Sequence, residues 1–159
     1  DMFQNMANGE IFNYVDISHC FWRIAYLKGY IKENLYKSIL NKPDLKTYRN
    51  MALACIIAPI KKEYYRRGEL LISVTEEKNL HRTIYDNIRF TAYNLMGDVQ
   101  RELGINVIGY RTDGIMIHAE DAEKVVAFFE SRSYHCSNKE CVKIDDKHYQ
   151  NSKGENKRF

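Results

Sequence analysis

The segment that most constrains the fold runs from residue 79 to residue 118. An apolar stripe recurs at helical spacing from about Asn79 to Leu103, and Gly104 follows where a helix commonly ends. Two short apolar stretches, residues 106–109 and 115–118, then flank Asp113-Gly114, a dipeptide typical of hairpin turns. A long helix leading into a tight antiparallel hairpin is therefore predicted.

The remaining segments predict a mixture of strands and helices. Residues 10–15 combine β-branched and aromatic side chains with near-alternating polarity, which predicts a strand leading into Asp16. Helical spacing, glycine breaks and proline positions predict further elements. They are helices after Ser18 with a break at Gly29, from about Pro43 to Ala58 and over residues 122–130, a hairpin over residues 61–74 turning at Arg66-Arg67-Gly68, and a last strand near residues 141–144. An α+β fold, with an antiparallel sheet and helices packed on one face, is the simplest way to bury these stripes.

Composition sets the class of protein but not its function. The 159 residues suit one domain, and the apolar content of 45% predicts a globular chain. Residues 151–159 are predicted to form a basic tail. The net charge of +3 permits contact with a phosphate backbone without arguing for it. The four cysteines show no paired framework, which favours a reducing cytoplasm, and no apolar run is long enough to predict a membrane span.

Asp16 and Asp113 are the strongest candidates for chemistry. Asp16 follows a predicted strand and Asp113 lies at the tip of a predicted hairpin, so both carboxylates reach the same sheet edge if these strands are neighbours. Such a pair can hold two magnesium ions about 3.5–4 Å apart for phosphoryl transfer. The alternatives are that Asp16 caps the next helix and that Asp113-Gly114 is only a turn.

Two groups of cations are candidates for binding phosphates. Lys46, Arg49 and Asn50 share one predicted face of the helix that begins near Pro43, and an exposed face of this kind can grip a triphosphate. The second group lies in the hairpin of residues 61–74, where tyrosines interleave with the cations Lys61, Lys62, Arg66 and Arg67. This hairpin suits a nucleic-acid backbone. For both groups a solvated polar surface is the alternative.

Four short motifs occur in an order that is familiar from one enzyme family. They are Asp16-Ile-Ser-His-Cys-Phe21, Lys46-Thr-Tyr-Arg-Asn50, Tyr110-Arg-Thr-Asp113-Gly114 and Lys147-His-Tyr149. In this order they resemble the palm, fingers, Asp-Thr-Asp and Lys-x-Tyr motifs of family B DNA polymerases, in the compact form found in phages and mobile elements. The resemblance spans about residues 10–150.

The resemblance implies a palm-like domain over residues 1–150 with a short fingers-like insertion at about 20–58. It implies a template-dependent DNA polymerase that uses Mg²⁺, with Mn²⁺ as an alternative, and acts on a DNA primer-template and deoxynucleoside triphosphates. The implied roles are metal binding by Asp16 and Asp113, packing under the sugar by Phe21, triphosphate binding by Lys46 and Arg49, shaping of the nucleotide pocket by Asn50, and primer or template contact by Lys147 and Tyr149. Without the resemblance, Phe21 fits a core position on its helix.

Several positions depart from the family pattern. Arg111 stands where the first aspartate of Asp-Thr-Asp is usual, and Leu53-Ala54 stands where Tyr-Gly is usual. The resemblance also implies a thumb domain, which would come from further segments or from a partner chain. Three functions remain open: an active nucleotidyltransferase, either minimal or the palm of a larger enzyme; a catalytically weakened palm that binds nucleic acid; and a structural or regulatory protein whose motif matches are coincidental.

Overall fold

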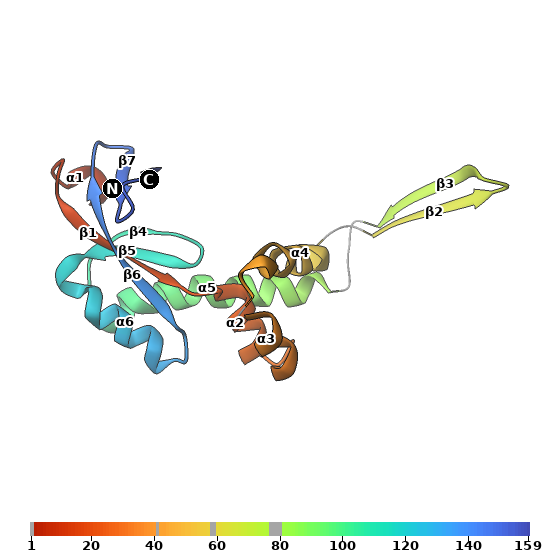
Figure 1. The fold of residues 1–159 in the computed structure, drawn as a ribbon, viewed down its shortest axis with the longest axis horizontal. Coiled ribbons are helices and arrows are strands. Elements are labelled where there is room, and N and C mark those ends of the chain that lie inside the picture. Colours follow the sequence, from red (N-terminus) through yellow and green to blue (C-terminus); the bar gives the residue numbers. More distant parts are fainter. Residues whose placement is uncertain (1, 41, 58–59, 77–80) are drawn as a thin grey trace. The chain divides into compact units, whose positions relative to one another are not determined.

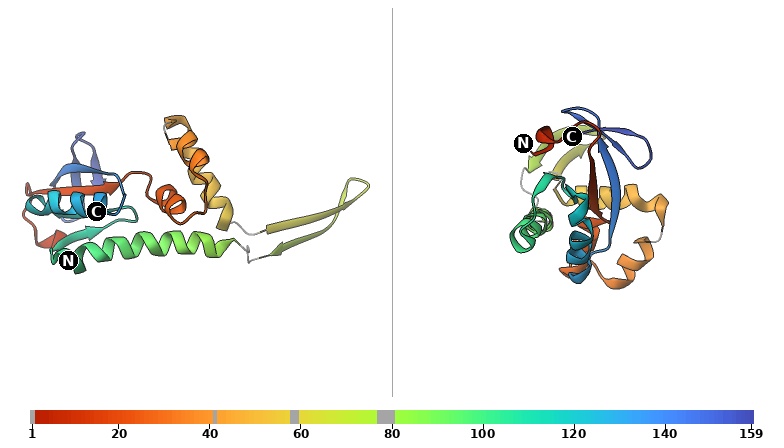
Figure 2. Two further views of the ribbon diagram at one scale, coloured as in Figure 1. Left: turned by 90° about the horizontal axis from the view of Figure 1, so that it is seen from below. Right: turned by 90° about the vertical axis from the view of Figure 1, so that its left-hand side faces the viewer.

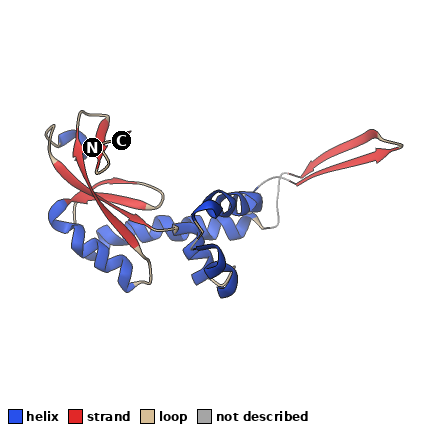
Figure 3. Ribbon diagram, in the orientation of Figure 1, coloured by secondary structure: helices blue, strands red, loops and turns tan. Residues whose placement is uncertain are grey.

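The computed structural model describes residues 2–40, 42–57, 60–76 and 81–159. By its internal contacts the chain divides into two compact units, one formed by residues 1–23 with 91–159 and the other by residues 24–90. The first unit holds the main sheet, and the second holds short helices and a separate hairpin (Figure 3). The first unit therefore combines segments from the beginning and the end of the given sequence.

Within the described residues, the main sheet has six antiparallel strands in the order β4-β5-β1-β6-β7-β8. The strands are β1 (Ile11–Ile17), β4 (Val107–Tyr110), β5 (Gly114–His118), β6 (Cys136–Lys143), β7 (His148–Asn151) and β8 (Asn156–Arg158). The first strand, β1, lies between β5 and β6 (Figure 1). This arrangement confirms the predicted α+β class and its antiparallel sheet.

The alternation of side chains along β1 gives the sheet two different faces. Phe12, Tyr14 and Asp16 point to one side, which we call the site face. Val15 and Ile17 point to the other, the apolar face, where both are buried. In register, Tyr14 and Asp16 pair with Met116 and Gly114 of β5, and with Lys139 and Ser137 of β6.

Helices account for the burial of the apolar face. Ile115 and Ile117 of β5 are fully buried there beside the β1 residues. The helix α6 (Ala122–Ser131) contacts β1 and β6 and buries Val125 and Phe129.

The longest helix, α5 (Arg82–Leu103), is continuous over its length (Figure 2). Gly104 ends α5 with a φ of +64°, and its N–H donates to the Gln100 carbonyl, as predicted for a helix cap.

One half of the site face is a closed hydrophobic core. The short helix α1 (Met2–Asn5) places Phe3 over Phe12, with the ring centroids 6.0 Å apart. The ring of Phe159 stacks on Phe3 at 3.8 Å. Gly109 leaves the room for this ring, because a Cβ there would lie 2.5 Å from a Phe159 carbon.

The C-terminal residues therefore differ from the predicted basic tail. Residues 156–158 form β8, which pairs with β7, and Phe159 closes the core. The two strands are three and four residues long and almost entirely polar, so they lack the apolar alternation by which a strand is recognised in a sequence.

The second unit follows the sequence prediction closely. A break at Gly29, with a φ of +75°, separates α2 (Cys20–Leu27) from α3 (Glu33–Leu40). A 3₁₀ turn over Pro43–Leu45 then leads into α4 (Lys46–Ile57). The strands β2 (Ile60–Arg66) and β3 (Glu69–Glu76) pair with each other and turn at Arg67-Gly68, both with positive φ. Ala58 and Asn79, the predicted end of one helix and start of another, lie outside the described residues.

Candidate active site

The open half of the site face brings Asp16 and Asp113 together. Asp16 is the penultimate residue of β1, and Asp113 immediately precedes β5. The N–H of Ile17 donates to the Asp113 carbonyl at 2.8 Å, which ties the two strand ends to each other. Both carboxylates lie within 3.5 Å of one atom, the phenol oxygen of Tyr14, which is 3.4 Å from Asp16 Oδ1 and 3.5 Å from Asp113 Oδ1.

The position of Asp16 decides between two interpretations of its role. The predicted strand ends before Asp16, but β1 continues through Ile17, and α2 begins only at Cys20. A helix cap must stand directly before the helix. Asp16 is therefore a strand residue that faces Asp113, and the helix-cap interpretation is wrong.

The ring of Tyr14 lies over the two acids in space that Gly114 of β5 leaves open. This ring lies against Gly114, where an added Cβ would be 2.6 Å from a ring carbon and 2.7 Å from the Val15 carbonyl oxygen. Glycine is thus required at this position by space and not by a turn conformation. No sequence pattern points to Tyr14, because its proximity to both acids follows only from the pairing of β1 with β5.

Lys139 supplies a cation beside the acids. Its Nζ lies 3.1 Å from Asp16 Oδ2 and 5.8 Å from the centre of the Tyr14 ring. Lys139 pairs with Tyr14 across β1 and β6, so the register of the sheet brings its ammonium to the acids. This residue was also missed in the sequence, where it belongs to a polar stretch with no apolar alternation.

Two like charges lie close together at this site, and the protein partly shields them from water. The Asp113 side chain retains contact with solvent, yet the protein around it raises its pKa, first by partial desolvation and then by the charge of Asp16. Burial and both carboxylates also raise the pKa of the Tyr14 phenol, which therefore stays a protonated donor. The same causes raise the pKa of the neighbouring Cys20 thiol to about 12, so this thiol is not a nucleophile at neutral pH.

The donor set of the acid pair fits a magnesium ion. Carboxylate oxygens are the hard ligands that Mg²⁺ prefers, and Mg²⁺ commonly binds proteins through one or two carboxylates together with substrate phosphates. Among the described residues, no group of three or more His, Cys, Asp or Glu side chains converges on one point. Two carboxylates are the number of protein ligands that Mg²⁺ commonly has where substrate oxygens complete its shell.

The residues predicted to bind the incoming nucleotide are divided between the two units. Phe21 lies partly buried in α2, in the unit that holds the acids. Lys46 and Asn50 are exposed on α4, as predicted. Arg49 is 4% exposed, and its guanidinium donates to the Ile39 carbonyl at 3.0 Å. The prediction that Arg49 belongs to an exposed cationic face is therefore wrong, because this side chain joins α4 to the end of α3.

The cations of the β2–β3 hairpin are all exposed, as the nucleic-acid hypothesis requires. They are Lys61, Lys62, Arg66 and Arg67. Tyr64 and Tyr65 between them are 54% and 60% exposed. Lys61 forms an ion pair with Glu63, which also accepts a hydrogen bond from the Tyr65 hydroxyl at 2.7 Å. Two exposed rings thus lie between two pairs of exposed cations along the hairpin.

The last predicted contacts with nucleic acid give a mixed outcome. Lys147 is exposed in the turn before β7. Tyr149 is only 7% exposed and packs edge-on against Phe12, with the ring centroids 5.5 Å apart. The prediction that Tyr149 contacts primer or template is therefore contradicted, because its ring belongs to the closed core.

No family model matches the chain, and neither a curated protein nor a solved structure is similar to it. In the described part of the chain, none of the helices has the length and apolarity needed for a membrane span.

Proposed function

We propose that this chain is a template-dependent nucleotidyltransferase with a palm-like fold that synthesises DNA on a primer-template from deoxynucleoside triphosphates. One observation carries the proposal: two aspartates from neighbouring strands share one tyrosine on the open half of an antiparallel sheet face. The motif order, which resembles that of family B DNA polymerases, supports the same function.

Asp16 and Asp113 are the residues that would hold Mg²⁺ or Mn²⁺. Desolvation and then the charge of Asp16 raise the Asp113 pKa, and a divalent cation would offset the repulsion between the two carboxylates. When bound, such an ion stabilises the charge that develops on the attacking and leaving oxygens of a phosphoryl transfer. Tyr14 would orient the two carboxylates, because its hydroxyl lies within reach of both.

Exposed groups elsewhere are available for the substrates. Lys46 and Asn50 on α4 are the candidates for the triphosphate, and Phe21 is the candidate for the sugar. The cations of the β2–β3 hairpin and Lys147 are the candidates for the nucleic-acid backbone, which attracts such charges without regard to sequence. A partner chain or further segments would supply the thumb.

The deciding experiment is primer extension with Mg²⁺ in Asp113→Asn and Asp16→Asn. Both changes remove a metal ligand while keeping the shape of the side chain, so we expect incorporation to fall about a thousandfold or more. Asp98→Asn is the matched control, because this carboxylate lies on α5 in an ion pair with Arg101. Circular dichroism would show that all three variants are folded. Extension at the wild-type rate by either site variant would contradict the metal assignment.

A second candidate function is a palm that binds nucleic acid without catalysis. The ion pair between Lys139 and Asp16 favours it, because a protein cation already lies where a metal would bind. On this proposal, primer-template binding would be independent of Mg²⁺ and would weaken steeply with salt, with no incorporation at any metal concentration. Binding titrations with and without Mg²⁺ distinguish the two functions.

A further inference from the structure

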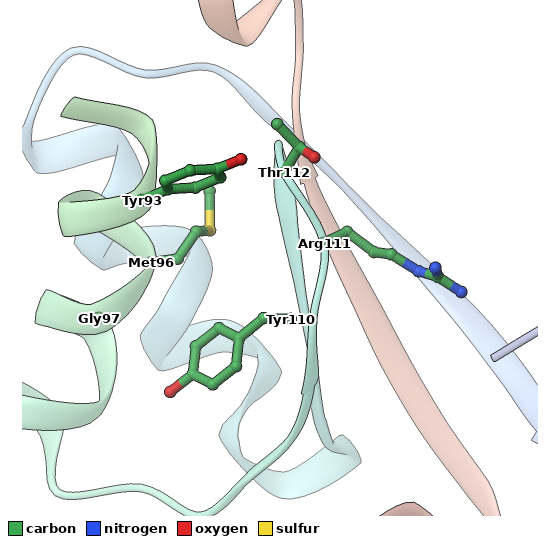
Figure 4. Close-up of a pocket in the computed structure, with 6 residues that line it drawn as sticks. All are labelled: Tyr93, Met96, Gly97, Tyr110, Arg111 and Thr112. Carbon is green, nitrogen blue, oxygen red and sulfur yellow. The ribbon is translucent and has the colours of Figure 1, made fainter. Parts of the chain in front are cut away.

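A pocket of about 520 Å³ opens between α5 and the β4–β5 hairpin, on the apolar face of the sheet, where Tyr110 pairs with Ile115. It is lined by Tyr93, Met96, Gly97, Tyr110, Arg111 and Thr112 (Figure 4). All six belong to the first unit. The volume is in the range of small-molecule sites. Because Asp113 directly follows Thr112, the pocket and the acid pair share one loop.

Two tyrosine rings dominate the walls of this pocket. Tyr93 is 43% exposed and Tyr110 is 48% exposed, whereas Met96 between them is buried. The Tyr110 hydroxyl donates to Gln100 Oε1 at 2.6 Å, which anchors the ring to α5. Exposed aromatic rings held in fixed positions are stacking surfaces for planar ligands, and they lose little conformational freedom on binding.

Gly97 forms the floor of the pocket in the middle of α5. Glycine is a poor choice within a helix, because alanine is more favourable there. The protein does not require it at this position: an added Cβ would meet nothing closer than Arg101 Nη1, at 4.0 Å. Gly97 thus leaves open, in the lining of the pocket, the space that an alanine methyl group would fill.

The charge of Arg111 is directed out of the pocket. Its Nη2 donates to the Arg158 carbonyl at 2.6 Å, and Figure 4 shows its side chain pointing away from both tyrosines. The pocket therefore presents two rings, a thioether and the Thr112 hydroxyl. This lining suits an uncharged planar group better than a phosphate.

We infer that the Tyr93–Tyr110 pocket binds a single nucleobase, stacked against the tyrosine rings, at the loop that also carries Asp113. The choice of a nucleobase rests on the proposed function, since the substrates of a nucleotidyltransferase carry bases, and the lining offers rings to stack on and no charge. Two sources offer the same chemistry: an unpaired base of a nucleic-acid strand and the base of a free nucleoside triphosphate.

The test uses 2-aminopurine, whose fluorescence is quenched when the base stacks on an aromatic ring. One arm titrates the protein into a single-stranded oligodeoxynucleotide that carries one 2-aminopurine, and the other into 2-aminopurine deoxynucleoside triphosphate. Quenching in the first arm identifies a strand base, and quenching only in the second identifies a free nucleotide. An unquenched probe in both arms would overturn the inference.

Three variants locate the binding. Tyr110→Leu removes a stacking ring, so we expect about tenfold weaker quenching. Gly97→Ala fills the floor and should weaken binding while raising the melting temperature, which a merely destabilising change cannot do. Phe90→Leu is the matched control, because Phe90 is an exposed ring on the same helix outside the pocket. Unchanged quenching in Tyr110→Leu and Gly97→Ala would refute the pocket assignment.

Primer extension separates this inference from the proposed function. Metal-dependent extension together with unchanged quenching in the pocket variants would leave the polymerase proposal standing and refute the pocket. Quenching that depends on Tyr110 and Gly97, in a protein whose extension is absent or survives Asp113→Asn, would support the pocket and refute the polymerase.

Discussion

The two halves of the site face are built from the same strands but differ in what covers them. At one half, Phe12 lies under Phe3 of α1 and beside Tyr149, and it is fully buried. At the other half, Tyr14 and Asp16, two and four residues further along β1, remain partly open. Residues on the same face of β1 therefore belong to the core where other side chains cover them, and to the candidate site where they remain partly open.

This difference separates the residues that hold the fold from those available for chemistry. Phe159 and α1 close the first half, and the sequence ends of the chain thus stabilise the strand that carries Asp16. The open half keeps two acids, a phenol and an ammonium in mutual reach. Substitutions on the two halves should then affect different measurements.

The largest effect is expected from Phe12→Ala in the closed half. Removing this buried ring deletes its contacts and leaves a cavity, which should lower the free energy of unfolding by about 3–5 kcal/mol. Urea unfolding monitored by circular dichroism measures the loss. Tyr14→Phe, two residues along the same strand, is the comparison and should change the stability by less than about 1 kcal/mol. Equal losses in both variants would show that the open half is also core.

The next effect is expected from Gly114→Ala, at the boundary between strand and site. The new Cβ would overlap both the Tyr14 ring and the Val15 carbonyl, and the backbone atom cannot move away cheaply. We expect a loss of about 1–3 kcal/mol in the free energy of unfolding. The double variant Tyr14→Ala, Gly114→Ala relieves only the ring overlap, so part of the loss should remain. Wild-type stability in the single variant would show that Tyr14 is not held over Gly114.

Sequence patterns predicted most elements and the pairing of the acids, for identifiable reasons. The hairpin around Asp113 combines apolar strands with a turn dipeptide, and α5 carries a long stripe that ends at a glycine. Tyr14 and Lys139 could not be found in this way, because their proximity to Asp16 depends on the register between strands.

The wrong predictions share one physical cause, which is that a residue type does not determine its own exposure. The charge of Arg49 predicts a place on a polar face. Its side chain is instead buried and donates a hydrogen bond to the Ile39 carbonyl. The resemblance implies that Tyr149 contacts primer or template, yet its ring fills the core. Long side chains of both kinds are buried when a neighbouring element offers a partner.

Stability should depend on pH in opposite ways at two aspartates. The folded pKa of Asp113 is raised, so its contribution to stability is fully present below the unfolded pKa, near pH 4, and is lost as the pH rises through the raised value. Without metal, Asp113→Asn should therefore be more stable than the wild type at pH 7, and the difference should close toward pH 4. Melting temperatures in the presence of EDTA measure this difference.

Asp145 is the control with the opposite sign. Its pKa is lowered by the Lys147 backbone N–H and by His148, so its contribution is present at neutral pH and is lost as the pH falls through the lowered value. Asp145→Asn should then be less stable than the wild type at pH 7. Parallel pH profiles for the two variants would contradict the raised pKa of Asp113.

The smallest effect is expected from Lys139→Met, which removes the cation of the open half but keeps much of its apolar stem. If Lys139 competes with a divalent ion for Asp16, its loss should strengthen Mn²⁺ binding about two- to fivefold, the range for a partly exposed ion pair. Electron paramagnetic resonance of free Mn²⁺ measures the affinity. Lys157→Met is the control, because Lys157 pairs with Glu155 on the exposed β7–β8 hairpin and should leave the affinity unchanged. Weaker Mn²⁺ binding in Lys139→Met would instead show that the ammonium positions Asp16 for the metal, and the open half would then be a site in which four side chains act together.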